Sequence, residues 1–133
     1  MFSSKPGKVQ NRIDSLIGAG TRVEGNITFT GGLRIDGEVL GNVTAAGDEP
    51  TALVISEHAR VEGEIHVSRI VVNGTIIGPV FASQFAELQP NSRVTGDLHY
   101  ASIEIHLGSV VQGRLVHQGS AAKAVELKLA SSN

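Results

Sequence analysis

The sequence contains no cysteine and no tryptophan, and only one tyrosine and four phenylalanines stand among its 133 residues. Without cysteine there is no disulfide framework, no thiolate metal site and no cysteine nucleophile, and the absence suits a reducing compartment. A globular β-sandwich usually recruits more aromatic side chains to fill its centre. The scarcity of aromatics therefore favours a narrow core filled by aliphatic side chains.

Charge and long hydrophobic runs are also scarce. The formal net charge is −2 and the isoelectric point is about 6.2, so no basic field attracts a nucleic-acid backbone and we expect no nucleic-acid partner. No run approaches the roughly 18 apolar residues of a membrane span, and the start of the chain lacks the apolar region of a secretory signal. These features predict a cytoplasmic protein.

What the sequence does contain is a repeat. The phrase at residues 60–65 reads RVEGEI, and it returns as RVEGNI at 22–27 and as RVTGDL at 93–98. A shorter form, an apolar residue on each side of x-Gly-x, places central glycines at positions 25, 41, 63, 78, 96 and 113, with a mean spacing of 17.6 residues. Short β-branched runs broken by glycine at this period predict a β-solenoid.

The repeat predicts an all-β parallel β-helix of about six rungs between residues 16 and 118, with a length of about 28 Å at one strand spacing per rung. Period-two runs at 33–37, 70–74 and 103–106 fit short strands with one face inside. The repeated glycines are expected at corners, so that Gly63→Val should introduce strain. The stretch from Asp48 to Thr51 is expected to bulge outward as an insertion. Residues 1–15 are predicted to form a flexible N-terminal arm and 119–133 a flexible C-terminal tail.

A rod of this kind has two ends that neither tail covers with an amphipathic cap. Each end should present unpaired backbone groups and a cross-section of aliphatic side chains, which favours contact with another copy of the chain. The outer apolar residues of the last rung are the candidates for the C-terminal contact: Ile105, Leu107, Val110, Val111, Leu115 and Val116. The candidates at the N-terminal end are Leu16, Ile17 and Val23.

The first residues offer a second type of contact. Met1 and Phe2 are apolar, and Lys5 and Lys8 can meet anionic head groups. Burying one phenylalanine contributes at most about 1.5–3 kcal/mol, and each lysine near an anionic surface adds about 1 kcal/mol. One arm would therefore bind weakly, whereas an array of linked arms would hold firmly. A membrane contact thus depends on polymerisation, and the alternative is an unstructured tail.

Neither catalytic nor ligand-binding chemistry is expected. His66 and His99 should point the same way from one wall but about 9.6 Å apart, too far for one metal. His58, His106 and His117 have no companion cysteine or carboxylate at the spacing of a metal site. We therefore predict no metal, cofactor or catalytic residue. Glu24, Glu62 and Asp97 are expected to form a screened ladder across rungs with Arg22, Arg60 and Arg93. The glycine-rich segments lack the Gly-Lys-Ser/Thr ending of a phosphate loop, so no nucleotide is expected.

The repeated phrases give the chain a resemblance to the bactofilins, which are bacterial cytoskeletal proteins built around a polymer-forming domain. The resemblance covers residues 16–118 and rests on the Val-x-Gly-x-Ile phrases, on LRIDGEVLGNV at 33–43 and on GSVVQGRL at 108–115. It implies a right-handed β-helix of triangular section whose subunits join end to end into non-polar filaments without nucleotide. It also implies that the start of the chain is a membrane-targeting arm. The expected protein is a scaffold at the inner face of the cytoplasmic membrane that localises cell-wall or cell-shape proteins.

Two alternatives fit parts of the pattern. The rung length also suits a left-handed hexapeptide-repeat acyltransferase or a γ-carbonic-anhydrase-like enzyme, which would form discrete trimers. A monomeric adaptor that displays one flat wall to a partner would show no self-assembly. Large or concentration-dependent assemblies favour the scaffold over both.

Overall fold

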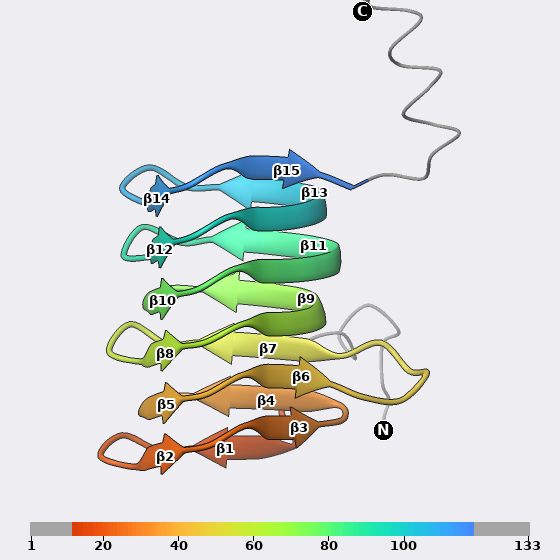
Figure 1. Ribbon diagram of the computed structural model, residues 1–133, viewed down its shortest axis with the longest axis vertical. Coiled ribbons are helices and arrows are strands. Elements are labelled where there is room, and N and C mark those ends of the chain that lie inside the picture. The colour runs from red at the N-terminus through yellow and green to blue at the C-terminus, as the bar shows by residue number, and fades with distance from the viewer. Residues whose placement is uncertain (1–11, 119–133) are drawn as a thin grey trace, which may run out of the picture.

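The computed structural model describes residues 12–118, which form fifteen β-strands and, within that range, no helix (Figure 1). The predicted arm and tail, including Met1, Phe2, Lys5 and Lys8, lie wholly or largely outside the described residues. Among the described residues, no helix is long and apolar enough to span a bilayer. Every strand pair is parallel. The prediction of an all-β parallel solenoid is confirmed.

The strands stack into three walls. The first wall contains β1 (Ser15–Ile17), β4 (Gly32–Ile35), β7 (Ala52–Ile55) and the C-terminal halves of β9 (Ile65–Val72), β11 (Val80–Leu88) and β13 (Leu98–Ile105). The second wall contains β2 (Arg22–Glu24), β5 (Glu38–Leu40), β8 (Arg60–Glu62), β10 (Thr75–Ile77), β12 (Arg93–Thr95) and β14 (Val110–Gln112). The third wall contains β3 (Ile27–Phe29), β6 (Val43–Ala45), the N-terminal halves of β9, β11 and β13, and β15 (Leu115–His117).

One strand from each wall makes one rung, and the chain completes six rungs from β1 to β15 (Figure 1). Rung 1 consists of β1, β2 and β3, and rung 6 consists of the end of β13 with β14 and β15. The long strands β9, β11 and β13 run from the third wall into the first without a break in the ladder, apart from a register shift in β11 between Ala82 and Phe85. The predicted number of rungs is confirmed.

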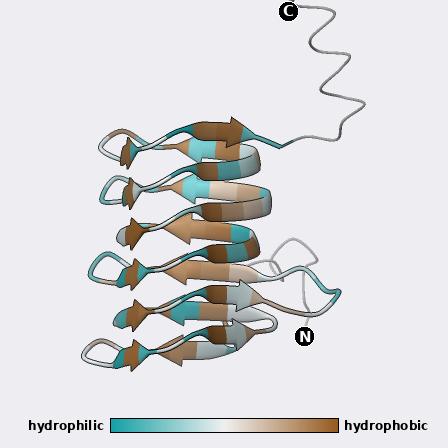
Figure 2. Cartoon of the chain, in the orientation of Figure 1, coloured by the Kyte–Doolittle hydropathy of each residue, from teal (hydrophilic) through white to brown (hydrophobic). Residues whose placement is uncertain are grey.

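Alternate residues of each strand point inward and stack into columns, because side chains alternate across a strand and parallel strands stay in register. In the first wall, Ile35, Ile55 and Leu88 belong to one such column, and all three are completely buried. The hydrophobic colour in Figure 2 follows the strands from the first rung to β15, while the turns are mostly hydrophilic. Phe29 is the one aromatic residue in the buried core of the described range. The core is therefore a narrow aliphatic column, as the composition predicts.

The repeated glycines stack at the corner between the second and third walls. Gly63 has a φ of +154°, and a β-carbon there would lie 2.1 Å from the carbonyl oxygen of Gly41 in the rung below. Gly113 stands in the same relation to Gly96, also at 2.1 Å. Both the backbone conformation and the close approach of the neighbouring rung exclude a side chain. The prediction that Gly63 is a corner residue is confirmed.

The residues that follow these glycines tie rungs together at both ends of the solenoid. The Asn42 backbone N–H donates to Asn26 Oδ1 at 2.9 Å, and the Glu64 N–H donates to Asn42 Oδ1 at 2.9 Å. In the fourth rung this position is Pro79, which has no N–H to donate. The series resumes at the top, where the Arg114 N–H donates to Asp97 Oδ1 at 3.0 Å. Short polar side chains at this corner therefore stabilise the stacking of rungs.

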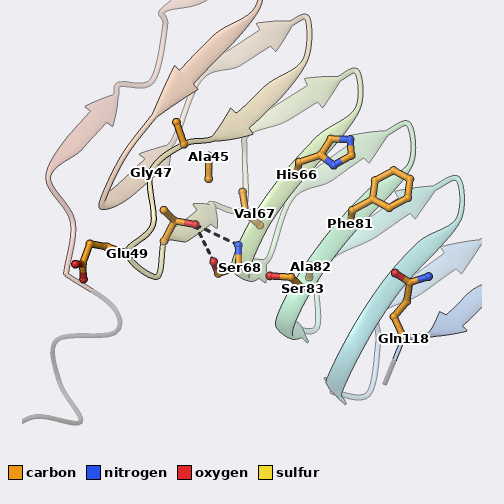
Figure 3. Close-up of a pocket in the computed structure, with 12 residues that line it drawn as sticks. Ala45, Gly47, Glu49, His66, Val67, Ser68, Phe81, Ala82, Ser83 and Gln118 are labelled. Carbon is orange, nitrogen blue, oxygen red and sulfur yellow. Dashed lines mark hydrogen bonds between the residues drawn. The ribbon is translucent and has the colours of Figure 1, made fainter. Parts of the chain in front are cut away.

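The insertion between β6 and β7 differs in part from the expectation. Asp48, Glu49 and Pro50 are exposed, as predicted, but Thr51 is only 4% exposed. Thr51 Oγ1 accepts the backbone N–H of Ser68 at 3.1 Å, in the region shown in Figure 3. The prediction that Thr51 bulges outward is wrong, because the chain must return to the wall at β7 and Thr51 satisfies a polar group of the adjacent rung there.

Candidate polymerisation faces

The C-terminal face consists of the inward side chains of rung 6. Ile105, Val111 and Leu115 supply one side chain from each wall. Ile105 follows Leu88 in its column and Leu115 follows Leu98, and both lower residues are completely buried. Ile105 is nevertheless 49% exposed and Leu115 44% exposed. The core therefore continues to this end of the described solenoid and stops there without a cover from residues 12–118.

At the N-terminal face, the inward residues of rung 1 are likewise more exposed than the residues of rung 2 that lie above them. Ile17 lies beneath Ile35 and Val23 beneath Val39, and the two upper residues are completely buried. Ile17 and Val23 themselves are only partly buried while they pack against the core. Both were predicted at this end, and both point into the open column of rung 1.

Three other predicted contact residues point sideways. Leu16 is in register with Arg34, and Val116 is in register with His99, so each belongs to an outward column of its wall. Val110 is likewise outward, because its neighbour Val111 occupies the inward column. Leu16 is 59% exposed on the outer surface of the first wall. These three residues border the end faces but do not project into them.

Leu107 lies in the turn between β13 and β14 and is 96% exposed, the highest value among the large hydrophobic residues of the described range.

Ile27 and Ile103 belong to the two faces, although neither is predicted from the sequence. Ile27 lies beneath the buried Val43 in the third wall, and Ile103 is an inward residue of rung 6. Ile27 ends one of the three repeated phrases, so the repeat itself could have identified it.

An ion pair fastens rung 6 to rung 5. The Arg114 guanidinium donates from Nη2 to Asp97 Oδ2 at 3.0 Å, in addition to its backbone bond. These hydrogen bonds from Arg114 hold the pKa of Asp97 below its usual value, and Asp97 in turn raises the pKa of Arg114. The last rung is therefore held by charge as well as by its strand pairing.

The predicted ladder of charges across rungs is mostly wrong. Arg22 Nε lies 3.0 Å from Glu24 Oε2, and Arg60 Nε lies 2.7 Å from Glu62 Oε2, so these pairs form within one strand. The arginines and the glutamates of the repeat stand in different columns of the second wall, and Leu40 separates Glu24 from Glu62 between rungs. Residues two apart on a strand face the same side, so each arginine reaches the carboxylate of its own strand. Two arginine–carboxylate contacts of the described residues do cross between rungs: Arg22 Nη1 to Glu38 Oε1 at 3.6 Å, and the Arg114–Asp97 pair at 3.0 Å.

The histidines of the third wall form a stacked ladder. His66 and His99 point outward from the same column, as predicted, with the Phe81 ring stacked between them at centroid distances of 4.5 and 4.4 Å. Figure 3 shows His66 and Phe81 side by side. Both line an open groove of about 270 Å³. The groove is lined mainly by small residues such as Ala45 and Gly47. The stacked rings account for both histidines as wall-packing side chains.

The prediction that His106 has no companion carboxylate is wrong. Its Nε2 lies 3.1 Å from Glu87 Oε2 and 3.1 Å from Glu104 Oε2. Glu87 comes from the rung below, so the sequence spacing alone hides one of the two neighbours. These three side chains are the group within the described residues that could hold a metal ion.

The fold and its two ends define a class: a short parallel β-solenoid in which residues 12–118 leave the aliphatic core open at both ends. The chain matches the family model described as "Bactofilin: Polymer-forming cytoskeletal" over residues 15–116. It therefore belongs to the bactofilin family and is a polymer-forming cytoskeletal protein. The family is one of structural proteins, which sets aside the acyltransferase and carbonic anhydrase alternatives.

Two relatives come from Myxococcus xanthus (strain DK1622). The chain is 23% identical to bactofilin BacP over 116 residues, which are 86% of this chain and 47% of BacP, so it spans about half the length of that relative. It is 26% identical to bactofilin BacO over 102 residues, which are 77% of this chain and 78% of BacO. No solved structure matches the chain.

Proposed function

We propose that the chain polymerises end to end through the two open faces of its solenoid. The observation that carries this proposal is the abrupt change in burial along two inward columns, from completely buried at Leu88 and Leu98 in rung 5 to nearly half exposed at Ile105 and Leu115 in rung 6. A second copy placed on the end would continue the columns and pair the free strand edges. Contacts of this kind bury aliphatic side chains and need no nucleotide.

The proposed filament is non-polar, with like ends meeting. Each face then makes its own two-fold contact, and two different two-fold interfaces alternate along the filament. The C-terminal contact is built from Ile103, Ile105, Val111 and Leu115, and the N-terminal contact from Ile17, Val23 and Ile27. Leu16, Val110 and Val116 lie beside these contacts with outward side chains, and Leu107 lies in the exposed turn next to the C-terminal contact.

Blocking one end tests both the assembly and its polarity. Leu115→Arg places a charge in the C-terminal face, and Val23→Arg does the same at the N-terminal face. In a non-polar filament each single variant still pairs through its intact end and stops at a dimer, while the double variant is a monomer. In a polar filament either single variant would stop at a monomer. Mass photometry distinguishes these outcomes, and long filaments from both variants would refute the assigned faces.

We further propose that the filament lies at the inner face of the cytoplasmic membrane. Met1, Phe2, Lys5 and Lys8 form the proposed contact, and they lie outside the described residues. The support is energetic, since one weak arm per subunit becomes strong when many are linked in a filament. Vesicles with anionic lipids should co-sediment the full chain but neither a variant lacking residues 1–8 nor the Leu115→Arg, Val23→Arg monomer. Equal sedimentation of all three would contradict the proposal.

A filament at the membrane can localise cell-wall or cell-shape proteins, which is the proposed cellular role. End-to-end joining leaves the three outer walls exposed, so partners would bind there. Replacing the native chain by the double end variant should disperse the protein from its cellular position and alter cell shape. Cells of normal shape in which the protein is dispersed would show that polymerisation is not needed for cell shape, which would contradict the proposed role.

A further inference from the structure

Three potential metal ligands meet on the outer surface of the first wall, near its corner with the second. Glu87 on β11 and Glu104 on β13 are in register, one directly above the other. His106 follows two residues after Glu104, and its Nε2 lies 3.1 Å from one carboxylate oxygen of each glutamate. The three donor atoms lie within 4.8 Å of one another. One donor from rung 5 and two from rung 6 thus converge on one point.

Hydrogen bonds among the three side chains cannot satisfy the imidazole and both carboxylates at the same time. A single ring nitrogen carries at most one N–H, so the protonated imidazole cannot give a full hydrogen bond to both carboxylates. In the neutral tautomer with the proton on Nδ1, an Nε2 lone pair faces both anions. Gln89 Nε2 adds one contact to Glu87 Oε2, at 3.3 Å. A cation at the common point would satisfy the imidazole and both stacked carboxylates together.

The donor set selects the kind of cation. Imidazole nitrogen and carboxylate oxygen bind zinc and other first-row divalent ions, whereas magnesium and calcium prefer oxygen alone. At zinc–ligand distances of about 2.0–2.2 Å, tetrahedral geometry separates neighbouring donors by roughly 3.3–3.6 Å, a few tenths of an ångström more than the two observed distances of 3.1 Å. We propose that Glu87, Glu104 and His106 form a zinc-type divalent metal site that links the last two rungs.

The exposure of the ligands fits a three-residue site with an open position. The side chains of Glu104 and His106 are 56% and 38% exposed, while that of Glu87 is 23% exposed. Solvent water can therefore complete the coordination. Below Glu87 the same column of the described wall continues with Val71 and Val54. The stacked pair of carboxylates therefore occurs once in this column, at Glu87 and Glu104. The site belongs to the C-terminal end alone and would brace the rung that carries Ile105.

The chain offers a matched control. His66 Nε2 lies 2.6 Å from Glu64 Oε2, so this pair has an imidazole and one carboxylate, with no second carboxylate in contact from residues 12–118. We expect isothermal titration of the untagged full chain with zinc chloride to show one zinc per chain. Glu87→Gln, Glu104→Gln and His106→Asn should each weaken that binding at least tenfold, while Glu64→Gln and His66→Asn should leave it unchanged. Cobalt(II) should bind at the same site and give visible absorption bands that the three variants lose.

The proposal concerns binding and does not depend on polymerisation, so the titration is repeated in the Leu115→Arg background. Circular dichroism confirms that each variant remains folded, and zinc should raise the Tm of the parent chain but not of the ligand variants. Zinc binding that persists unchanged in all three ligand variants would show adventitious binding by other histidines. That result, or no binding at millimolar zinc, would overturn the site.

Discussion

Leu115 lies directly above Leu98 in one inward column of the third wall, yet Leu98 is completely buried and Leu115 is 44% exposed. The two residues have the same side chain and the same orientation, so the difference comes from the absence of a further rung above Leu115 in the described solenoid. Covering the exposed half of such a side chain contributes about 1 kcal/mol. Three or four aliphatic side chains per face, together with the pairing of free strand edges, make a contact of moderate strength, so the extent of assembly depends on protein concentration.

The direction of each side chain predicts different results for neighbouring substitutions. Leu115→Arg should abolish long filaments, because it places a charge in the end contact, where burial without a partner is costly. Val116→Arg changes the adjacent residue, which points outward beside His99, and should leave filaments intact. Negative-stain electron microscopy of the two variants at equal concentration checks this prediction. Loss of filaments in both, or in neither, would contradict the division between inward and outward residues.

The glycine corner should tolerate no side chain. Gly63→Val should destabilise the chain by at least about 3 kcal/mol, because it combines a positive φ with a collision against the Gly41 carbonyl oxygen. Gly18→Ala is the control, since a β-carbon at Gly18 meets no atom within 4 Å. Thermal denaturation should show a decrease in Tm of about 10 °C or more for the first variant and little change for the second. Equal Tm values would show that the corner can relax.

The Asp97–Arg114 pair predicts a dependence of stability on acid pH. Hydrogen bonds from Arg114 place the pKa of Asp97 below its ordinary value of 3.8. The stabilisation is therefore complete above that ordinary value and is lost as the pH falls through the lower pKa of the folded state. Between about pH 5 and 2.5, the Tm of the parent chain should fall more steeply than that of Asp97→Asn. Parallel curves would show that the ion pair contributes no stability.

Ser92 offers a substitution that should stabilise the chain. Its side chain is completely buried, and its Oγ has no hydrogen-bond partner among the described residues. Ala59 occupies the equivalent position, directly before the arginine of its repeat, and is also buried. Ser92→Ala should remove the cost of the unsatisfied hydroxyl and add about 1 kcal/mol to the free energy of unfolding. Denaturant unfolding in the Leu115→Arg background measures this, and a loss of stability would reveal a partner for the hydroxyl.

Most of the fold can be predicted from the repeat in the sequence. The phrases that contain Gly25, Gly63 and Gly96 show the period, the corner and the inward residues on either side of it, because parallel stacking demands the same backbone geometry in every rung. Six rungs and an aliphatic core follow from that period and from the scarcity of aromatics. The sequence thus predicts the architecture without any single strongly diagnostic residue.

The end faces and the ligand cluster were harder to predict. Leu16 and Ile17 are both apolar, and only the register with Arg34 and Ile35 shows that the first points outward and the second inward. The cluster at His106 needs Glu87 from the rung below, so its spacing in the sequence carries no ligand signature. Such features depend on the stacking register between rungs, which the insertions of unequal length conceal.

The axial repeat of the assembled filament tests the central claim most directly. Cryo-electron microscopy of the unmodified chain should show solenoids joined along their axes, with a subunit length of about 28 Å from six strand spacings. Ile105, Val111 and Leu115 should be buried in one contact and Ile17, Val23 and Ile27 in the other. A chain that remains a single particle at millimolar concentration, or a filament in which these faces stay exposed to solvent, would contradict the account.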